Sequence, residues 1–196
     1  MILLLLLQIA RSGAMTAPPL PYVDQGACPF ECCVYRDWTA EKQFTAVKHH
    51  DAPGNKERSF IVKRGERVTA MSGIVITTAA GVVRVTKPVT LEVYSKRFPK
   101  APVEKLALAP DARLYLLTPQ GEGWMSGWAD GRLLESFDAA SFADASVCEK
   151  SSRCDGIVQK QAAREWWVKV RNSRGQFGWI LMPRSYPTFS GTDACG

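Results

Sequence analysis

The stretch that decides the fold is EWWVKVRNSRGQFGWI, Glu165–Ile180. Apolar and charged side chains alternate in its first half, as they do along a β-strand with one buried face. Asn172–Gly175 then supplies the short polar residues and the glycine of a hairpin turn, and a second apolar segment follows. The sequence therefore predicts an antiparallel hairpin whose core face carries Trp166, Val168 and Val170.

The opposite face of the first strand carries Trp167, Lys169 and Arg171. Because the two basic side chains favour solvent, we expect this face to be exposed. Trp167 is therefore the leading candidate for a ligand contact, since tryptophan is enriched in binding surfaces.

The hairpin resembles the W-x-x-V…G-x-x-G-W-[IV] signature of bacterial SH3-like domains. The matching residues are Trp167, Val170, Gly175, Gly178, Trp179 and Ile180. The resemblance implies a small, strongly bent β-barrel that binds a ligand and performs no chemistry. In SH3 domains the tryptophan three residues before the small core residue lines the peptide groove, and Trp167 has this position relative to Val170.

The same resemblance suggests further groove residues. The tetrapeptide PRSY resembles the P-x-x-Y that completes the groove, although it is displaced by two residues, and it makes Pro183 and Tyr186 candidate ligand contacts. Trp128, Trp124 and Tyr115 are further candidates from the segments upstream. The alternative for these aromatic side chains is that they fill the core, because a small barrel needs large residues inside.

Short segments rich in β-branched residues run through the rest of the chain. The first series covers residues 43–48, 59–62, 67–71, 74–78 and 82–85, with Gly65, Gly73 and Gly81 between segments. Within it, Lys63–Val68 resembles the K-x-G-E-x-V step of bacterial SH3-like domains. A second series covers residues 112–117 and 121–128, and Asp138–Ala145 is predicted as a short capped helix.

We therefore predict an all-β protein of one or two small SH3-like β-barrels, with a disulfide-clipped N-terminal arm and a short helical insertion. The predicted parts are a signal peptide (1–14), a linker and cysteine-rich arm (15–42), a first barrel (43–96), a second barrel (97–186) with an insertion (138–164), and a tail (187–196). A single larger barrel with long excursions is the alternative, because the repeat between the two halves is weak.

The N-terminus predicts export. Residues 2–7 are apolar, small residues follow, and a signal peptidase would cut after Ala14. The apolar run is too short to span a bilayer, which needs about 20 residues. We expect a periplasmic or secreted protein with no stable membrane span. The alternative is a start codon placed inside a longer signal.

Six cysteines predict a disulfide framework in an exported chain. They are Cys28, Cys32, Cys33, Cys148, Cys154 and Cys195. Cys148 and Cys154 enclose a polar loop that a local bridge would close, and a bridge from the N-terminal arm to the tail would use Cys195. Adjacent Cys32 and Cys33 are not expected to bond each other. A zinc site using the arm cysteines with His49 and His50 is the alternative, but the spacing fits no standard site.

The charge pattern bears on partners. The formal net charge is +6, from 25 Lys and Arg against 19 Asp and Glu. The basic residues are scattered and do not form the dense stripe with interleaved aromatics that is typical of nucleic-acid surfaces. We therefore expect no nucleic acid as a partner. A mildly basic exported protein fits an anionic envelope polymer.

The chain carries no recognisable catalytic motif. A cysteine nucleophile would need a histidine base, and the two histidines, His49 and His50, fall in a predicted loop. We expect no enzyme activity, no cofactor and no metal. The predicted function is binding of a peptide, peptidoglycan or an envelope protein. The alternatives are a structural or inhibitory protein that packs on a partner, and a small metal-binding or hydrolytic protein.

Overall fold

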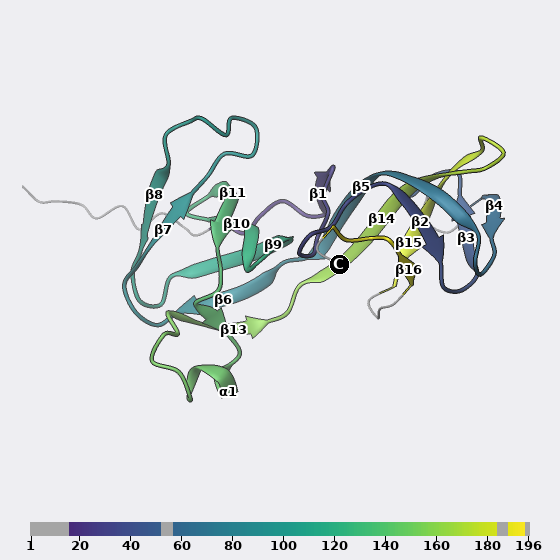
Figure 1. Ribbon diagram of the computed structural model, residues 1–196. Helices are drawn as coiled ribbons and strands as arrows, with labels where there is room; N and C mark the ends of the chain where they lie inside the picture. Colours follow the sequence, from purple (N-terminus) through teal and green to yellow (C-terminus); the bar gives the residue numbers. More distant parts are fainter. Residues whose placement is uncertain (1–15, 52–56, 184–187, 195–196) are drawn as a thin grey trace, which may run out of the picture.

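The computed structural model describes residues 16–51, 57–183 and 188–194, and within them the protein is almost entirely β (Figure 1). The described helix, α1, covers only Ala145–Cys148. The strands form two lobes that are built on different sheets. The all-β prediction is confirmed.

The first lobe is a curled sheet with the strand order β16-β2-β5-β14-β15-β3-β4, and β1 also pairs with β5 (Figure 1). Its strands are β1 (Tyr22–Gln25), β2 (Asp37–Ala40), β3 (Phe44–Val47), β4 (Arg58–Val62), β5 (Arg67–Ala79), β14 (Ala163–Asn172), β15 (Phe177–Met182) and β16 (Phe189–Ser190). The sheet encloses an aromatic-rich core. In it, the rings of Phe44 and Phe189 stack with centroids 4.5 Å apart.

The predicted tryptophan hairpin is confirmed as β14 and β15. The two strands pair antiparallel from Trp166 opposite Met182 to Arg171 opposite Phe177. Asn172 fixes the turn, because its Oδ1 accepts hydrogen bonds from the backbone N–H groups of Arg174 and Gln176, each at 3.0 Å.

The second lobe contains a sheet with the order β11-β10-β9-β6-β13-β12 and a separate pair, β7 with β8. Its strands are β6 (Gly81–Val85), β7 (Val89–Val93), β8 (Glu104–Leu108), β9 (Arg113–Gly121), β10 (Trp124–Ala129), β11 (Arg132–Asp138), β12 (Phe142–Ala143) and β13 (Gly156–Lys160). Aliphatic residues and two phenylalanines, Phe137 and Phe142, dominate its core.

The sheets do not follow the predicted boundary at residues 96 and 97. Strands β2 to β5 share a sheet with β14 and β15, and residues 81–160 form the second lobe between them. The cause is the long antiparallel pairing of β5 with β14, from Ala79 opposite Ala163 to Val68 opposite Asn172. The second lobe is thus an insertion between two neighbouring strands of the first.

Two local predictions were wrong. Residues 67–71 and 74–78 were expected as two strands separated at Gly73, but β5 is continuous from Arg67 to Ala79. Gly73 is required there by close packing, since a Cβ at this position would lie 2.7 Å from both the Ala27 carbonyl oxygen and Trp166 Nε1. The helix expected over Asp138–Ala145 is absent because Phe142 pairs with Gly156 in a short parallel ladder and is buried in the core.

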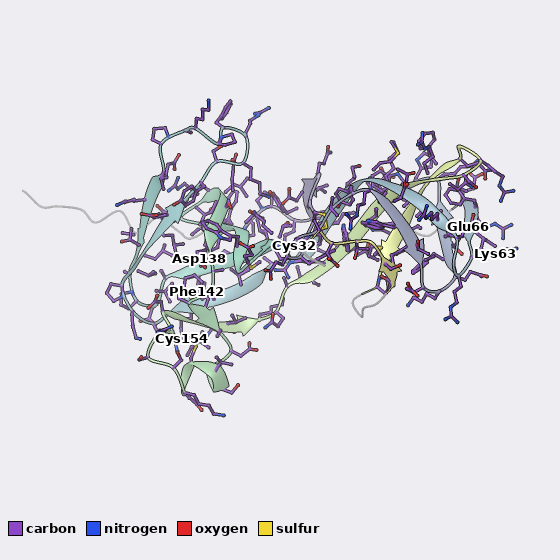
Figure 2. All side chains as sticks on the ribbon, viewed as in Figure 1. Cys32, Lys63, Glu66, Asp138, Phe142 and Cys154 are labelled. Carbon is purple, nitrogen blue, oxygen red and sulfur yellow. A yellow bond between two sulfur atoms is a disulfide. The ribbon has the colours of Figure 1, made fainter. Side chains whose placement is uncertain are left out.

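Parts of the predicted arm and of the predicted tail also belong to the first lobe. The predicted arm contains β1 and β2, and β16 of the predicted tail pairs with β2. The backbone N–H of Ala194 donates to the Cys32 carbonyl at 2.8 Å, so the arm and the tail are neighbours. Figure 2 shows Cys32 between the lobes, whereas Lys63 and Glu66 lie at the far end of the first lobe.

Two disulfides are present among the described residues, Cys28–Cys33 and Cys148–Cys154. The second confirms the predicted local bridge, and the first clips the N-terminal arm. Cys32 is also disulfide-bonded, and none of the described cysteines is free. Cys195 and the predicted signal peptide lie outside the described residues. Disulfides of this kind indicate an oxidising compartment. In the described part of the chain, no helix has the length and apolar character needed to cross a membrane.

Candidate binding cleft

Trp166 lines a cleft between the two lobes, although its strand presents it to the core. The side chain is 8% exposed. Its Nε1 donates a hydrogen bond to the Tyr35 hydroxyl at 3.3 Å, and its ring meets those of Phe30 and Trp38 edge-on, with centroids 5.5 and 6.2 Å away. These contacts hold the indole in one orientation, with one edge at the cleft.

The cleft lies where β5 and β14 run from the first lobe to the second. It has a volume of about 380 Å³, within the usual range for ligand sites. Both lobes and the arm contribute to its lining, which consists of Pro29, Val75, Pro119, Gln161, Ala162, Arg164, Trp166, Met182 and Pro183. Seven of the nine lining residues are apolar, and three of these are prolines, whereas Gln161 and Arg164 are polar. Polar and apolar atoms contribute about equally to the surface.

Arg164 is the charged residue among the described residues of this lining. The side chain is half-buried, and its Nε donates a hydrogen bond to the carbonyl oxygen of Leu117 on β9. This bond fixes the guanidinium at the cleft wall and ties β14 to the second lobe. A fixed guanidinium beside apolar walls favours a carboxylate or another planar anion.

The predicted exposure of Trp167 was wrong, since its side chain is only 2% exposed. The alternation itself was correct, because Trp166, Val168 and Val170 belong to the core. On the other face, Trp167 lies beside Ile74, its neighbour on β5, and Ile74 is buried as well. The Trp167 Nε1 donates to Glu165 Oε2 at 2.8 Å. The period of a strand gives the face of a residue but not what covers that face.

Of the other predicted ligand contacts that the structure describes, Pro183 alone lines this cleft. Tyr186 lies outside the described residues. Tyr115 and Trp128 are opposite each other on β9 and β10 of the second lobe. Trp124 lies on β10 and meets the Tyr94 ring edge-on, with centroids 5.4 Å apart.

Several cleft residues were missed by the sequence analysis. Trp166 was assigned to the core, and Arg164 fell at the end of the predicted insertion. Pro29 and Pro119 come from parts of the chain far from the hairpin in sequence, so no local pattern points to them. The one available signal was Pro183, which the SH3-like resemblance had already singled out.

The cysteines of the alternative zinc site are in disulfides in this structure, so they cannot act as thiolate ligands. Cys28 and Cys33 are bonded to each other. The His50 ring packs edge-on against the Trp179 ring, with centroids 4.5 Å apart. Within the described ranges, no three histidine, cysteine, aspartate or glutamate residues are grouped closely enough to hold a metal ion.

Comparisons of the chain with protein-family models, with curated proteins and with solved structures give no match.

Proposed function

We propose that the protein is a non-catalytic, exported binding protein whose SH3-like first lobe recognises a peptide, free or as part of a cell-wall polymer, in the cleft beside Trp166. The observation that carries this proposal is the cleft itself. It combines a fixed aromatic residue, three proline side chains and one oriented guanidinium. Apolar walls with a few placed polar groups are typical of ligand sites.

The lining also suggests the chemistry of the ligand. Proline walls are rigid and carry no N–H, so they favour an extended apolar segment over a polar, hydrogen-bonded one. Arg164 favours a carboxylate on that segment. A short peptide with a free carboxylate satisfies both requirements, and so does a peptidoglycan stem peptide.

Two features support an SH3-like first lobe. The tryptophan hairpin has the expected pairing. The segment expected to match the K-x-G-E-x-V step forms a tight turn, in which the Lys63 N–H donates to Glu66 Oε2 at 2.9 Å and Gly65 has a φ of 77°. A φ in this range favours glycine.

Arg164→Gln tests the proposal. Calorimetry with peptidoglycan fragments, and with short peptides that end in a carboxylate or an amide, should show tighter binding of the carboxylate forms. The variant should lose about tenfold in affinity for them, or about 1.4 kcal/mol, because the charge is removed while a hydrogen-bond donor remains. Arg174→Gln, on the exposed hairpin turn, is the control. Equal affinities for the two variants, or equal binding of amide and carboxylate, would contradict the proposal.

A second candidate function is an inhibitory or structural role on a partner protein. Phe98 is 63% exposed in the connection between β7 and β8, and Tyr94 and Val103 in the same connection are exposed too. Glu135 holds the start of this connection, since its Oε2 accepts from Ser95 Oγ and from the Lys96 N–H, each at 2.8 Å. A fixed segment with an exposed aromatic tip fits a protein partner.

Photo-crosslinking separates the two functions. A photoreactive phenylalanine analogue at position 98 should give one defined protein adduct in the native host if this connection is an interface. The same analogue at position 177, an exposed phenylalanine of the first lobe, is the control. Identical adduct patterns at both positions would remove the second candidate.

A further inference from the structure

An apolar row crosses the outer face of the second-lobe sheet. The strand registers place Leu133, Trp128, Tyr115 and Val82 opposite one another on β11, β10, β9 and β6. None of the four belongs to the core of this lobe, and each keeps part of its side chain exposed. With strands about 4.8 Å apart, the row is about 14 Å long. It shares no residue with the cleft beside Trp166.

The N-terminal segment of the same chain lies on this face. Trp128 Nε1 donates a hydrogen bond to the Thr16 carbonyl oxygen at 2.8 Å. A Cβ on Gly131, in the turn between β10 and β11, would lie 3.3 Å from Thr16 Oγ1. Pro18 is buried, whereas the next residue, Pro19, is exposed. One proline of the pair is therefore covered, and the other points to solvent.

The other end of this segment is also attached. Tyr22 is half-buried and shares a cavity with Leu133, and burial, helped by the Asp24 carboxylate, raises its pKa to about 12. Asp24 forms an ion pair with Lys96 at 2.8 Å. Residues 16–21, Thr-Ala-Pro-Pro-Leu-Pro, thus run between two fixed points across one end of the apolar row.

The contacts match a general way of binding proline-rich chains. Proline fixes φ, so such a segment loses little entropy when it is bound, and its carbonyl groups remain free to accept hydrogen bonds. A tryptophan N–H beside an apolar aromatic surface supplies both the donor and the packing. The hydroxyl of Tyr115 makes no hydrogen bond within the described part of the chain, so the uncovered end of the row offers a second donor.

We propose that the outer face of β9, β10 and β11 is a docking surface for an extended, proline-rich peptide segment of a partner protein, and that residues 16–21 occupy it in the free protein as a displaceable internal ligand. A tethered ligand has an effective concentration in the millimolar range, so it suppresses binding of a weak external one. Release of residues 16–21 therefore opens the surface.

Pro18→Asp in the full-length protein tests the proposal, because it places a charge at the buried proline and leaves β1 intact. Pro19→Asp, which adds the same charge at the exposed proline, is the matched control. Fluorescence anisotropy with a labelled peptide of residues 16–22 gives the affinities. We expect Pro18→Asp to bind the peptide at least about tenfold more tightly than the wild type and Pro19→Asp do. Adding Trp128→Phe, which keeps an aromatic ring but removes the N–H, should reverse this gain.

Equal affinity of the Pro18 and Pro19 variants, or binding that is unaffected by Trp128→Phe, would overturn the proposal. Concentration-dependent dimers that form without binding of the free peptide would also overturn it, in favour of exchange of the segment between two copies. A second measurement does not depend on the folding of a charged variant. Hydrogen exchange of the Trp128 indole N–H, followed by NMR, should accelerate in Pro18→Ala and not in Pro19→Ala, and an unchanged rate in both would contradict the docking.

Discussion

Trp166 and Trp167 are adjacent on β14 and face opposite sides of the sheet, yet both are buried. The sequence correctly predicted their opposite faces, because alternation along a strand is a local property. It did not predict the burial of Trp167, because the cover of the outer face comes from residues distant in the chain. Lys169 and Arg171 indicated an exposed face. The side chain of Arg171 is exposed, whereas that of Lys169 is half-buried.

Truncation of either tryptophan should therefore destabilise the protein. Trp166→Ala and Trp167→Ala should each lower the free energy of unfolding by about 3–5 kcal/mol, because each leaves a cavity in a packed region. Trp167→Phe keeps most of the packing but loses the hydrogen bond to Glu165. We expect the loss of this bond to lower the free energy of unfolding by about 1 kcal/mol. Urea denaturation followed by circular dichroism measures all three. A Trp167→Ala variant as stable as the wild type would mean that this side chain is exposed in solution.

At the scale of elements, strands were predicted well where alternation and turn residues agree. The hairpin of β14 and β15 is the clearest case, since Asn172 and Gly175 form the expected turn. The prediction of a helix over Asp138–Ala145 was wrong because residues within it pair with β13 as strand β12. A capping pattern is local and does not reveal such a distant pairing partner. Asp138 uses its Oδ1 to accept from the Ala140 N–H, which makes a turn between β11 and β12. Long-range pairing therefore overrode the local signal.

The connection between β7 and β8 should respond to acid through Glu135. The hydrogen bond from Ser95 Oγ, helped by those from the Lys96 and Arg97 N–H groups, lowers the pKa of this carboxyl below its ordinary value, although burial acts in the opposite direction. The stabilisation is present above the ordinary glutamate pKa and is lost as the pH falls through the lowered value in the folded protein. We expect trypsin to cleave at Lys96 or Arg97 faster in Glu135→Gln than in the wild type at neutral pH.

Glu122→Gln, at an exposed turn, is the control for this prediction. An acid-active protease should cleave the wild type at this connection only when the pH is below the ordinary glutamate pKa. Cleavage that is independent of Glu135 at all pH values would show that the connection is held by other contacts.

At the scale of the whole molecule, the short β-branched segments predicted an all-β protein and the cysteines predicted disulfides, but neither predicted the division into lobes. The pairing of β5 with β14 joins segments separated by the whole second lobe, and no local pattern encodes it. The cleft was missed for the same reason. Pro29, Pro119 and Pro183 are far apart in the sequence, and they line one cleft in the folded protein. The Cys148–Cys154 bridge was predictable because it is local.

The remaining cysteine pairing is a prediction for the whole chain. Cys28–Cys33 and Cys148–Cys154 are formed, and Cys32 is bonded, so Cys195 is its expected partner. Peptide mapping of the non-reduced protein should give these three links and no free thiol. Cys32→Ser with Cys195→Ser should cost about 2–5 kcal/mol, because the bridge would close most of the chain into one loop. A free Cys195 in the native protein would contradict this pairing.

The insertion of the second lobe between β5 and β14 sets the order in which the parts of the protein emerge during synthesis. Residues 81–160 emerge before β14 does, so the second lobe can finish its sheet while one edge of β5 still lacks its main partner. An unpaired strand edge is a site of aggregation, and pairing of distant segments is slow. We therefore expect the first lobe to spend part of its synthesis as an open sheet and to close late in folding, once the tryptophan hairpin has emerged.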